Sequence, residues 1–275
     1  MSTGNTTPKL NADNYYGSKD YMSVSLFKAF AKCEASALAT LRGEYEEEKG
    51  EALYLGSFVD EMLTGTPESR EKFLAENHDI VYKRDGKLRE NFARAQEAVT
   101  RLNLYQPYML ELLSGEHQAI MTGQIEGVPF KIKMDSYKPG EFIADLKYMK
   151  SLRSPNLFQP MIQYWGYDLQ AAAYQEIVYQ NTGHRLPFYF VVITKEQPAH
   201  YEVGEIPQED MDAALETIRQ NIVHYWDIVQ GKVEAERCED YNCDYCTLTH
   251  VVTEPVDTNT FGMSAKQRKA MKGEV

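Results

Sequence analysis

GVPFKIKMDSYKPGEFIADLKYMK, residues 127–150, is the stretch that decides the fold of this chain. Apolar and polar side chains alternate over 130–135 and again over 144–148, a pattern typical of strands with one face in the core. The Lys-Pro-Gly break at 138–140 supplies turn chemistry between them. The stretch therefore predicts two strands joined by a turn.

Two aspartates and one lysine lie on these predicted strands. Side chains two residues apart share a face of a strand, so Asp145 and Lys147 point the same way and Leu146 turns to the other side, into the core. Asp135 ends the preceding strand and can approach Asp145 from there. A plain hairpin about this turn would leave the two aspartates a few residues out of register, so we expect a bend or bulge to bring them together.

These residue types suit metal-assisted hydrolysis of a phosphodiester. Magnesium prefers oxygen ligands and is usually held by one or two carboxylates, waters and substrate phosphate. Asp135 and Asp145 could supply the carboxylates. A metal-bound water is more acidic than bulk water, and the metal neutralises charge building on phosphorus. Lys147 would orient or help deprotonate that water. The simpler alternative is a solvated strand with an exposed ion pair.

The spacing resembles the PD-(D/E)XK nuclease superfamily, whose mark is an acidic residue, a gap, and then acidic-x-Lys. Here these positions are Asp135 and Asp145-Leu146-Lys147. The resemblance implies an α/β fold with a central mixed sheet flanked by helices, and helical additions at the N-terminus. It also implies that the backbone carbonyl of Leu146 joins the two carboxylates as a ligand of Mg²⁺, for which Mn²⁺ could substitute.

Two further motifs resemble RecB-like and RecE-like nucleases. The predicted helix 51–63 carries the sequence Gly-Ser-Phe-Val-Asp, which places Asp60 where these families have a metal-facing histidine or acidic residue. The predicted long helix that begins at Met161 carries a Gln-x-x-x-Tyr motif, Gln170 and Tyr174, one turn apart on one face. The resemblance implies that Asp60 is a third metal carboxylate and that Gln170 and Tyr174 are catalytic. The alternatives are a surface aspartate and an ordinary amphipathic helix.

Three of the four cysteines cluster near the end of the chain, in RCEDYNCDYC. Thiolates at this spacing suit tetrahedral zinc or an iron–sulfur cluster, and both need four ligands. Cys238, Cys243 and Cys246 would therefore need Cys33, near the other end of the chain. This order of cysteines, one before the core and three after it, resembles the arrangement in AddB-like nucleases. The resemblance implies a [4Fe-4S] cluster. The alternative is that the four are buried or spectator cysteines.

Composition narrows the class of protein. The 275 residues carry a formal net charge of −12, which argues against a surface coated in basic residues, yet six cations against three anions leave +3 over residues 131–153. No apolar run approaches the length of a membrane span, and the N-terminus lacks the apolar block of a signal peptide. We therefore expect a cytoplasmic protein with no membrane partner, in which the cysteines are reduced.

The rest of the chain supplies support for this stretch. We expect a flexible lead-in over 1–20, a nuclease domain over 21–250 and a polar tail over 251–275. The remaining expected elements are a helix from Ser23 to Leu41, a strand at 118–126, a strand buried on both faces at 187–195, an antiparallel strand at 200–203 and a helix at 207–229.

For the RecE-like branch the resemblance implies a magnesium-dependent exonuclease that degrades linear double-stranded DNA in phage-type recombination. Its expected partners are DNA ends and a single-strand annealing recombinase, and its expected assembly is a homo-oligomeric ring. One alternative is an endonuclease or a helicase-associated nuclease with the same site. An alternative of another class is a noncatalytic DNA-binding or metal-stapled structural module.

Overall fold

The fold is described from a computed structural model, which covers residues 10–11, 14–47, 50–238, 243–252, 255, 257–260, 263 and 271. Its centre is one five-stranded sheet in the order β1-β2-β3-β4-β5. The strands are β1 (Glu116–Ile125), β2 (Val128–Lys138), β3 (Phe142–Met149), β4 (Phe188–Thr194) and β5 (Tyr201–Glu205). Only β3 and β4 run parallel, and the other neighbours are antiparallel. The expected mixed sheet and the antiparallel last strand are confirmed.

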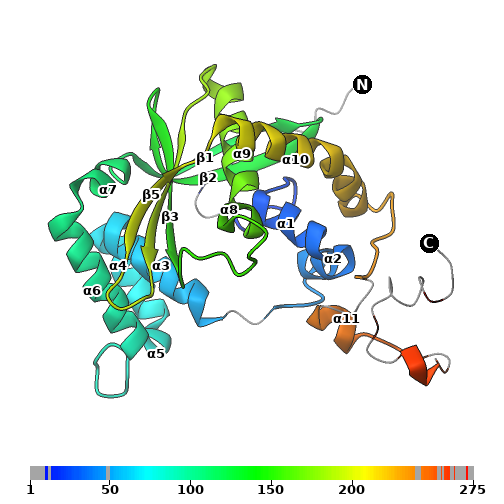
Figure 1. Cartoon of the computed structure of the whole chain (residues 1–275), viewed down its shortest axis with the longest axis horizontal. Coiled ribbons are helices and arrows are strands. Elements are labelled where there is room, and N and C mark those ends of the chain that lie inside the picture. Colours follow the sequence, from blue (N-terminus) through cyan, green and yellow to red (C-terminus); the bar gives the residue numbers. More distant parts are fainter. Residues whose placement is uncertain are drawn as a thin grey trace.

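Helices cover both faces of the sheet (Figure 1). One face carries α1 (Val24–Lys32), α9 (Tyr167–Thr182) and α10 (Gln208–Val229), and the other carries α3 (Glu51–Thr64), α6 (Glu90–Tyr105) and α7 (Pro107–Leu112). The remaining helices are α2 (Glu34–Arg42), α4 (Pro67–Glu76), α5 (His78–Val81), α8 (Met161–Tyr164), α11 (Asp244–Leu248) and the 3-10 turn η1 (Thr258–Thr260). The expected helices on both sides of the sheet are thus confirmed. None of the helices described is long and apolar enough to span a bilayer.

Alternation along β3 distributes its side chains between two cores. Ile143 joins the core beneath α1, α9 and α10, whereas Ala144 and Leu146 join the core beneath α3, α6 and α7. Successive side chains of a strand point to opposite faces, so Asp145 and Lys147 face the α9 side. This alternation directs the two charged groups of the Asp-x-Lys motif toward the helix that carries Gln170.

The register of β2 and β3 differs from our expectation. The two strands form three residue pairs, the last of which joins Ser136 to Ala144. Continued by one residue, this register places Asp135 opposite Asp145. The expected mismatch was wrong because the turn is centred on Gly140, one residue later than the Lys-Pro-Gly break suggested. The strands stop pairing beyond this point, and the two aspartates lie where the strands part.

The expected helix from Ser23 to Leu41 is two helices. Ser23 caps α1 as predicted, its hydroxyl accepting from the backbone N–H of Leu26. Cys33 then adopts an extended conformation, with φ −166° and ψ 113°, and ends α1 and begins α2. No glycine or proline marks this break, so apolar spacing alone could not reveal it. The break turns the Cys33 thiol toward the C-terminal cysteines.

The expected helix from Met161 is also interrupted. α8 ends at Tyr164, and Gly166 takes φ 60° before α9 begins. A side chain at Gly166 would meet Lys28 and Leu169 at 3.3 Å in addition to the left-handed strain, so only glycine fits there without movement. The kink lets the Lys28 ammonium donate to the backbone carbonyl of Trp165.

Part of the expected lead-in is anchored to the sheet. Tyr15 is buried, and Lys131 of β2 donates hydrogen bonds to the backbone carbonyls of Tyr15 and Ser18. Met22 exchanges backbone hydrogen bonds with β2, to Pro129 and from Lys131. Residues 1–9, and most of the expected tail at 251–275, lie outside the described residues.

Candidate active site

The structure brings Asp135, Asp145 and Lys147 together where β2 and β3 part. One Asp135 oxygen accepts a hydrogen bond of 3.0 Å from the backbone N–H of Leu146. Lys147 forms an ion pair with Oδ2 of Asp145, whose side chain is 4% exposed against 20% for the lysine. The hydrogen bond from Leu146 therefore ties the end of β2 to β3 just beyond their last backbone pair, and it fixes the spacing of the two acids.

Gln170 and Tyr174 lie on the face of α9 that covers this point. The Gln170 amide donates a hydrogen bond to Oδ1 of Asp145. The buried Tyr174 hydroxyl donates to the backbone carbonyl of Lys133, at 2.9 Å. Gln170 therefore orients one acid directly, and Tyr174 fixes the β2 backbone two residues before the other acid.

Asp60 approaches from α3, which packs on the opposite face of the sheet. Its Oδ1 accepts from the Thr64 hydroxyl at 3.0 Å, and its Oδ2 accepts from the Gln118 amide at 3.2 Å. The same amide nitrogen lies 3.4 Å from Oδ1 of Asp135. A Cβ at Gly56 would meet nothing within 4 Å, so close packing does not explain that glycine.

Burial and nearby carboxylates make Asp135 and Asp60 reluctant to ionise. Burial raises the pKa of Asp135 well above its ordinary value, and the carboxylates of Asp145 and Asp60 raise it further. Burial likewise raises the pKa of Asp60. For Lys147, burial works to lower the pKa, but the Asp145 and Asp135 carboxylates outweigh it and the pKa is raised. Without a cation, Asp135 and Asp60 are therefore held toward their neutral forms, and a bound cation would favour their charged forms.

This donor set fits a divalent metal ion in type. Carboxylate oxygens are the ligands that Mg²⁺ prefers, and Oδ2 of Asp145 is a buried oxygen that faces the Lys147 ammonium. Among the described residues, the four cysteines are the one group of three or more possible metal ligands gathered closely enough for an ion, and the three carboxylates are not such a group. The Gln118 amide bridges Asp60 and Asp135.

Replacing Asp135 with asparagine is expected to stabilise the metal-free protein at pH 7. The folded chain keeps a proton on Asp135 at pH values where the unfolded chain, with an ordinary pKa of about 3.9, has released it. The wild-type fold therefore loses stability as pH rises above about 4, and the variant avoids this loss. In thermal melts, the Tm of the variant should exceed that of the wild type by a difference that widens as pH rises above about 4, by about 2–4 °C for each kcal/mol of stability.

The exposed Asp79→Asn variant serves as the control, because its carboxylate is fully exposed. Added magnesium should stabilise the wild type and leave Asp135→Asn almost unchanged. If Asp135→Asn melts below the wild type at every pH, then Asp135 is held by favourable contacts and its burial does not destabilise the ionised fold.

Sequence reasoning assigned no role at this site to two residues, Gln118 and Lys28. Gln118 has φ 54°, a left-handed conformation that residues other than glycine rarely adopt. Both Lys28 and Lys147 lie over the ring of Tyr167, at 5.5 and 5.1 Å from its centroid. No local motif marks Gln118. The backbone conformation of Gln118 and the approach of α1 to α9 arise only in the folded chain.

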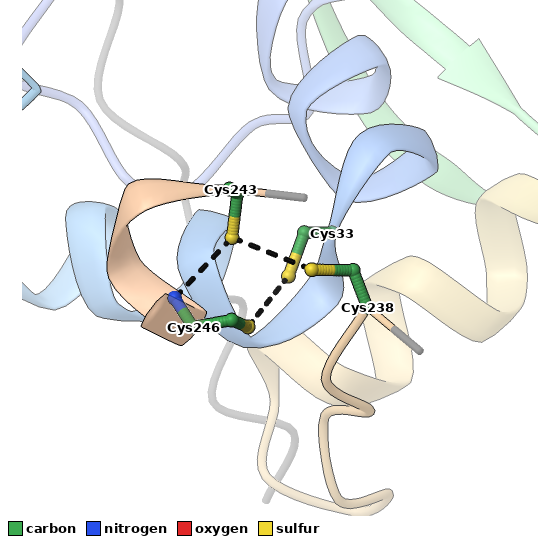
Figure 2. Close-up of side chains that lie close together, drawn as sticks. All are labelled: Cys33, Cys238, Cys243 and Cys246. Carbon is green, nitrogen blue, oxygen red and sulfur yellow. Dashed lines mark hydrogen bonds between the residues drawn. The ribbon is translucent and has the colours of Figure 1, made fainter. Parts of the chain in front are cut away.

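The four cysteines form a second cluster (Figure 2). Their sulfur atoms all lie within 4.8 Å of one another, with Cys33 to Cys246 at 3.5 Å and Cys238 to Cys243 at 3.6 Å. Cys33 comes from the junction of α1 and α2, and the other three come from the C-terminal segment around α11. Cys33 therefore lies beside the three C-terminal cysteines, as any site with four cysteine ligands would require.

The spacing of these sulfurs suits a single tetrahedral ion. Zinc–sulfur bonds of about 2.3 Å place neighbouring sulfurs of a tetrahedron roughly 3.8 Å apart. Burial raises the pKa of the Cys246 thiol to about 12, so without a cation this sulfur stays protonated at pH 7. A cysteine binds a metal ion as the thiolate, so metal binding here would release protons from the thiols.

Comparison with known proteins gives two findings. Residues 23–249 match the family described as "PDDEXK-like domain of unknown function (DUF3799)". A crystal structure from Eubacterium rectale, described as "Putative exonuclease", is similar to this chain with 36% sequence identity and a TM-score of 0.84, over 91% of this chain and 97% of that chain. No curated protein matches the chain.

Proposed function

We propose that this chain, which belongs to the family of PDDEXK-like domains, is a nuclease and that it hydrolyses the phosphodiester bonds of DNA. Family membership confirms the resemblance expected from the spacing of Asp135, Asp145 and Lys147. The observation that carries the proposal is the meeting of these three side chains where β2 and β3 part, beneath Gln170 of α9.

In this proposal the acids hold Mg²⁺, for which Mn²⁺ can substitute. Asp135, Asp145 and the backbone carbonyl of Leu146 are the proposed ligands, with Asp60 contributing directly or through water. When bound, the ion would acidify a water molecule and neutralise charge on the scissile phosphate. Lys147, held at Asp145, would orient the attacking water and screen the phosphate.

The remaining site residues would keep the acids in position. The Gln170 amide donates to one Asp145 oxygen, so that carboxylate cannot turn freely. The Tyr174 hydroxyl holds the β2 backbone at Lys133. Positioning of this kind supports catalysis because a ligand displaced by a fraction of an ångström binds its metal poorly.

We propose double-stranded DNA ends as the substrate. The support is the sequence resemblance to RecE-like nucleases and the similarity to a protein described as an exonuclease. The expected context is phage-type recombination beside a single-strand annealing protein, with the chain working as a homo-oligomeric ring.

Digestion of linear and covalently closed circular DNA tests this proposal. The purified chain, incubated with magnesium, is expected to degrade the linear duplex and spare the circle, because only the linear form offers ends. The matched control is Asp145→Asn prepared in the same way, which removes any contribution from contaminating nucleases.

Each outcome decides between the functions considered. Loss of both substrates would replace the exonuclease with an endonuclease. Loss of neither, with magnesium or manganese, would overturn the proposal and favour a noncatalytic DNA-binding or metal-stapled module.

We also propose that Cys33, Cys238, Cys243 and Cys246 hold a structural metal. The sulfur spacings support one zinc ion. A four-iron cluster would need the thiolates to spread, since it places iron and sulfide between them. Metal analysis separates the two: one zinc per chain in a colourless protein supports zinc, iron with a brown colour supports [4Fe-4S], and neither metal overturns the site.

A further inference from the structure

A groove of ≈ 580 Å³ lies beside the candidate active site. Its walls are residues 16–19 of the anchored N-terminal segment, one side of α1 and α2, and Cys243 of the cysteine cluster. Its volume falls within the roughly 300–1,000 Å³ typical of ligand sites. Neither the hydrolytic reaction proposed above nor the cysteine metal site accounts for this groove.

The groove is cationic in a chain of net charge −12. Lys19, Lys28 and Lys32 line it against one acidic residue, Glu47. Glu47 lies 3.7 Å from Lys32, and both side chains are about two-thirds exposed, so this ion pair is weak and easily exchanged for another anion. Three lysines that line one groove suit a ligand with several negative charges.

Hydroxyl groups accompany these lysines along the groove. Ser18, Ser25, Ser36 and Thr40 all line it. The Ser18 hydroxyl is a buried side-chain polar atom for which the described part of the chain offers no hydrogen-bond partner. Ammonium and hydroxyl groups together are the side chains that contact phosphate and sugar oxygens.

Lys28 connects the groove to the candidate catalytic lysine. Its ammonium lies over the same Tyr167 ring as that of Lys147. Burial lowers the pKa of Lys28, and the charge of Lys147 lowers it further, whereas Asp168 and Asp145 act in the opposite direction. A phosphate group bound at Lys28 would therefore lie close to a phosphate group bound at Lys147.

Tyr16 provides an aromatic surface at the rim of the groove. Its side chain is 79% exposed, and two neighbouring side chains contact it. The Lys133 ammonium donates to the Tyr16 hydroxyl at 2.8 Å and lies 4.4 Å from the ring centroid, while Tyr15 packs edge-on against it. An exposed ring held in place is a suitable surface for stacking a nucleotide base.

We propose that this groove binds single-stranded DNA, with phosphates on Lys19, Lys28 and Lys32 and a base on the Tyr16 ring. The inference rests on the proposed nuclease function and deepens it, because it gives the strand at the active site a path along α1 toward the cysteine cluster. Single strands are favoured over a duplex because their bases are unstacked and free to cover an aromatic ring.

Fluorescence anisotropy with a fluorescein-labelled 20-nucleotide oligothymidylate, without added divalent metal, tests this inference. The Lys19→Ala/Lys32→Ala double variant is expected to bind about tenfold more weakly. The slope of log affinity against log salt should flatten by about 0.7 for each lysine removed. Tyr16→Ala should weaken binding roughly 5- to 150-fold through lost stacking, whereas Tyr16→Phe, which keeps the ring, should weaken it far less.

Lys72→Ala is the matched control. Lys72 is 73% exposed and pairs with Glu76 at 3.9 Å, much as Lys32 pairs with Glu47, but it lies outside the groove. Wild-type affinity in Lys72→Ala together with the losses above supports the inference. The inference is overturned if Lys72→Ala loses as much affinity as the groove variants, or if the wild type does not bind the oligothymidylate at low salt.

The binding assay needs no cleavage, so it separates the two proposals. Groove-dependent binding by a chain that cuts no DNA with magnesium would retain the groove and reject the nuclease. Wild-type affinity for the oligothymidylate in both Lys19→Ala/Lys32→Ala and Tyr16→Ala, in a chain that cuts DNA with magnesium, would reject the groove and retain the nuclease.

Discussion

Replacing Lys147 with methionine is expected to lower the rate of magnesium-dependent DNA cleavage by about 10²- to 10⁴-fold, the range usual for a positioned proton-transfer group. Methionine keeps the unbranched stem and loses the charge. The ammonium is the cation paired with Asp145, and it lies 5.1 Å from the Tyr167 ring centroid, in a position to meet water and phosphate. Cleavage of a labelled linear duplex measures the loss.

Lys195→Met is the matched control for this variant. Lys195 follows β4, and its ammonium lies 5.2 Å from the Tyr148 ring centroid, but it has no contact with the candidate acids among the interactions of the described chain. It should cleave at close to the wild-type rate. Cleavage by Lys147→Met at that rate would contradict the proposed role of the lysine.

Loss of the lysine alone leaves Asp145 buried and unpaired, which can destabilise the fold. The double variant Lys147→Met/Asp145→Asn removes both charges, so it should melt near the wild type and remain inactive. If Lys147→Met melts close to the wild type and still fails to cleave DNA, the loss belongs to chemistry. If Lys147→Met is largely unfolded at the assay temperature and the double variant melts well above it, the loss belongs to instability.

Replacing Cys33 with serine is expected to release the metal of the cysteine cluster and to destabilise the protein by at least about 3 kcal/mol, since structural zinc sites contribute directly to folding. At this chain length that corresponds to a fall in Tm of roughly 6–12 °C. The cysteines and two neighbours form a small apolar cluster apart from the two large cores. The segment around α11 should therefore detach first.

Metal content, thermal melting and limited proteolysis together measure this effect. Cys33→Ser should lose its metal and be cut between residues 230 and 250 under conditions that leave the wild type intact. Ser36→Ala is the control, because Ser36 is a buried residue of the same helix α2 that supplies no sulfur ligand. Unchanged melting and proteolysis in Cys33→Ser would show that the cysteines do not staple the chain.

The strands and the helix at the centre of the fold could be predicted from the local spacing of apolar and polar residues. Alternation over 144–148 identified a strand and placed Asp145 and Lys147 on one face, because the strand period of two survives in any sheet. The continuous apolar run at 187–195 identified the neighbouring buried strand β4. The spacing of Gln170 and Tyr174 on a helix placed both on the face that meets the sheet. These features depend on a few consecutive residues.

The remaining features depend on contacts between distant segments. The register of β2 and β3 is set by a turn one residue later than the sequence suggested, and this shift places Asp135 opposite Asp145. The break at Cys33 has no local signal, and its use becomes evident only when the C-terminal cysteines approach. Gln118 adopts its left-handed conformation at the meeting point of β1, β2 and α3, which no single segment encodes.

The central claim is that Asp135 and Asp145 hold a divalent ion beside Lys147. The anomalous scattering of Mn²⁺ bound in a crystal of this protein tests it most directly, because the signal locates the metal independently of any activity. The claim predicts a peak coordinated by both aspartates where β2 and β3 part, within reach of the Lys147 ammonium. A fully occupied manganese ion elsewhere, with both carboxylates uncoordinated, would contradict it.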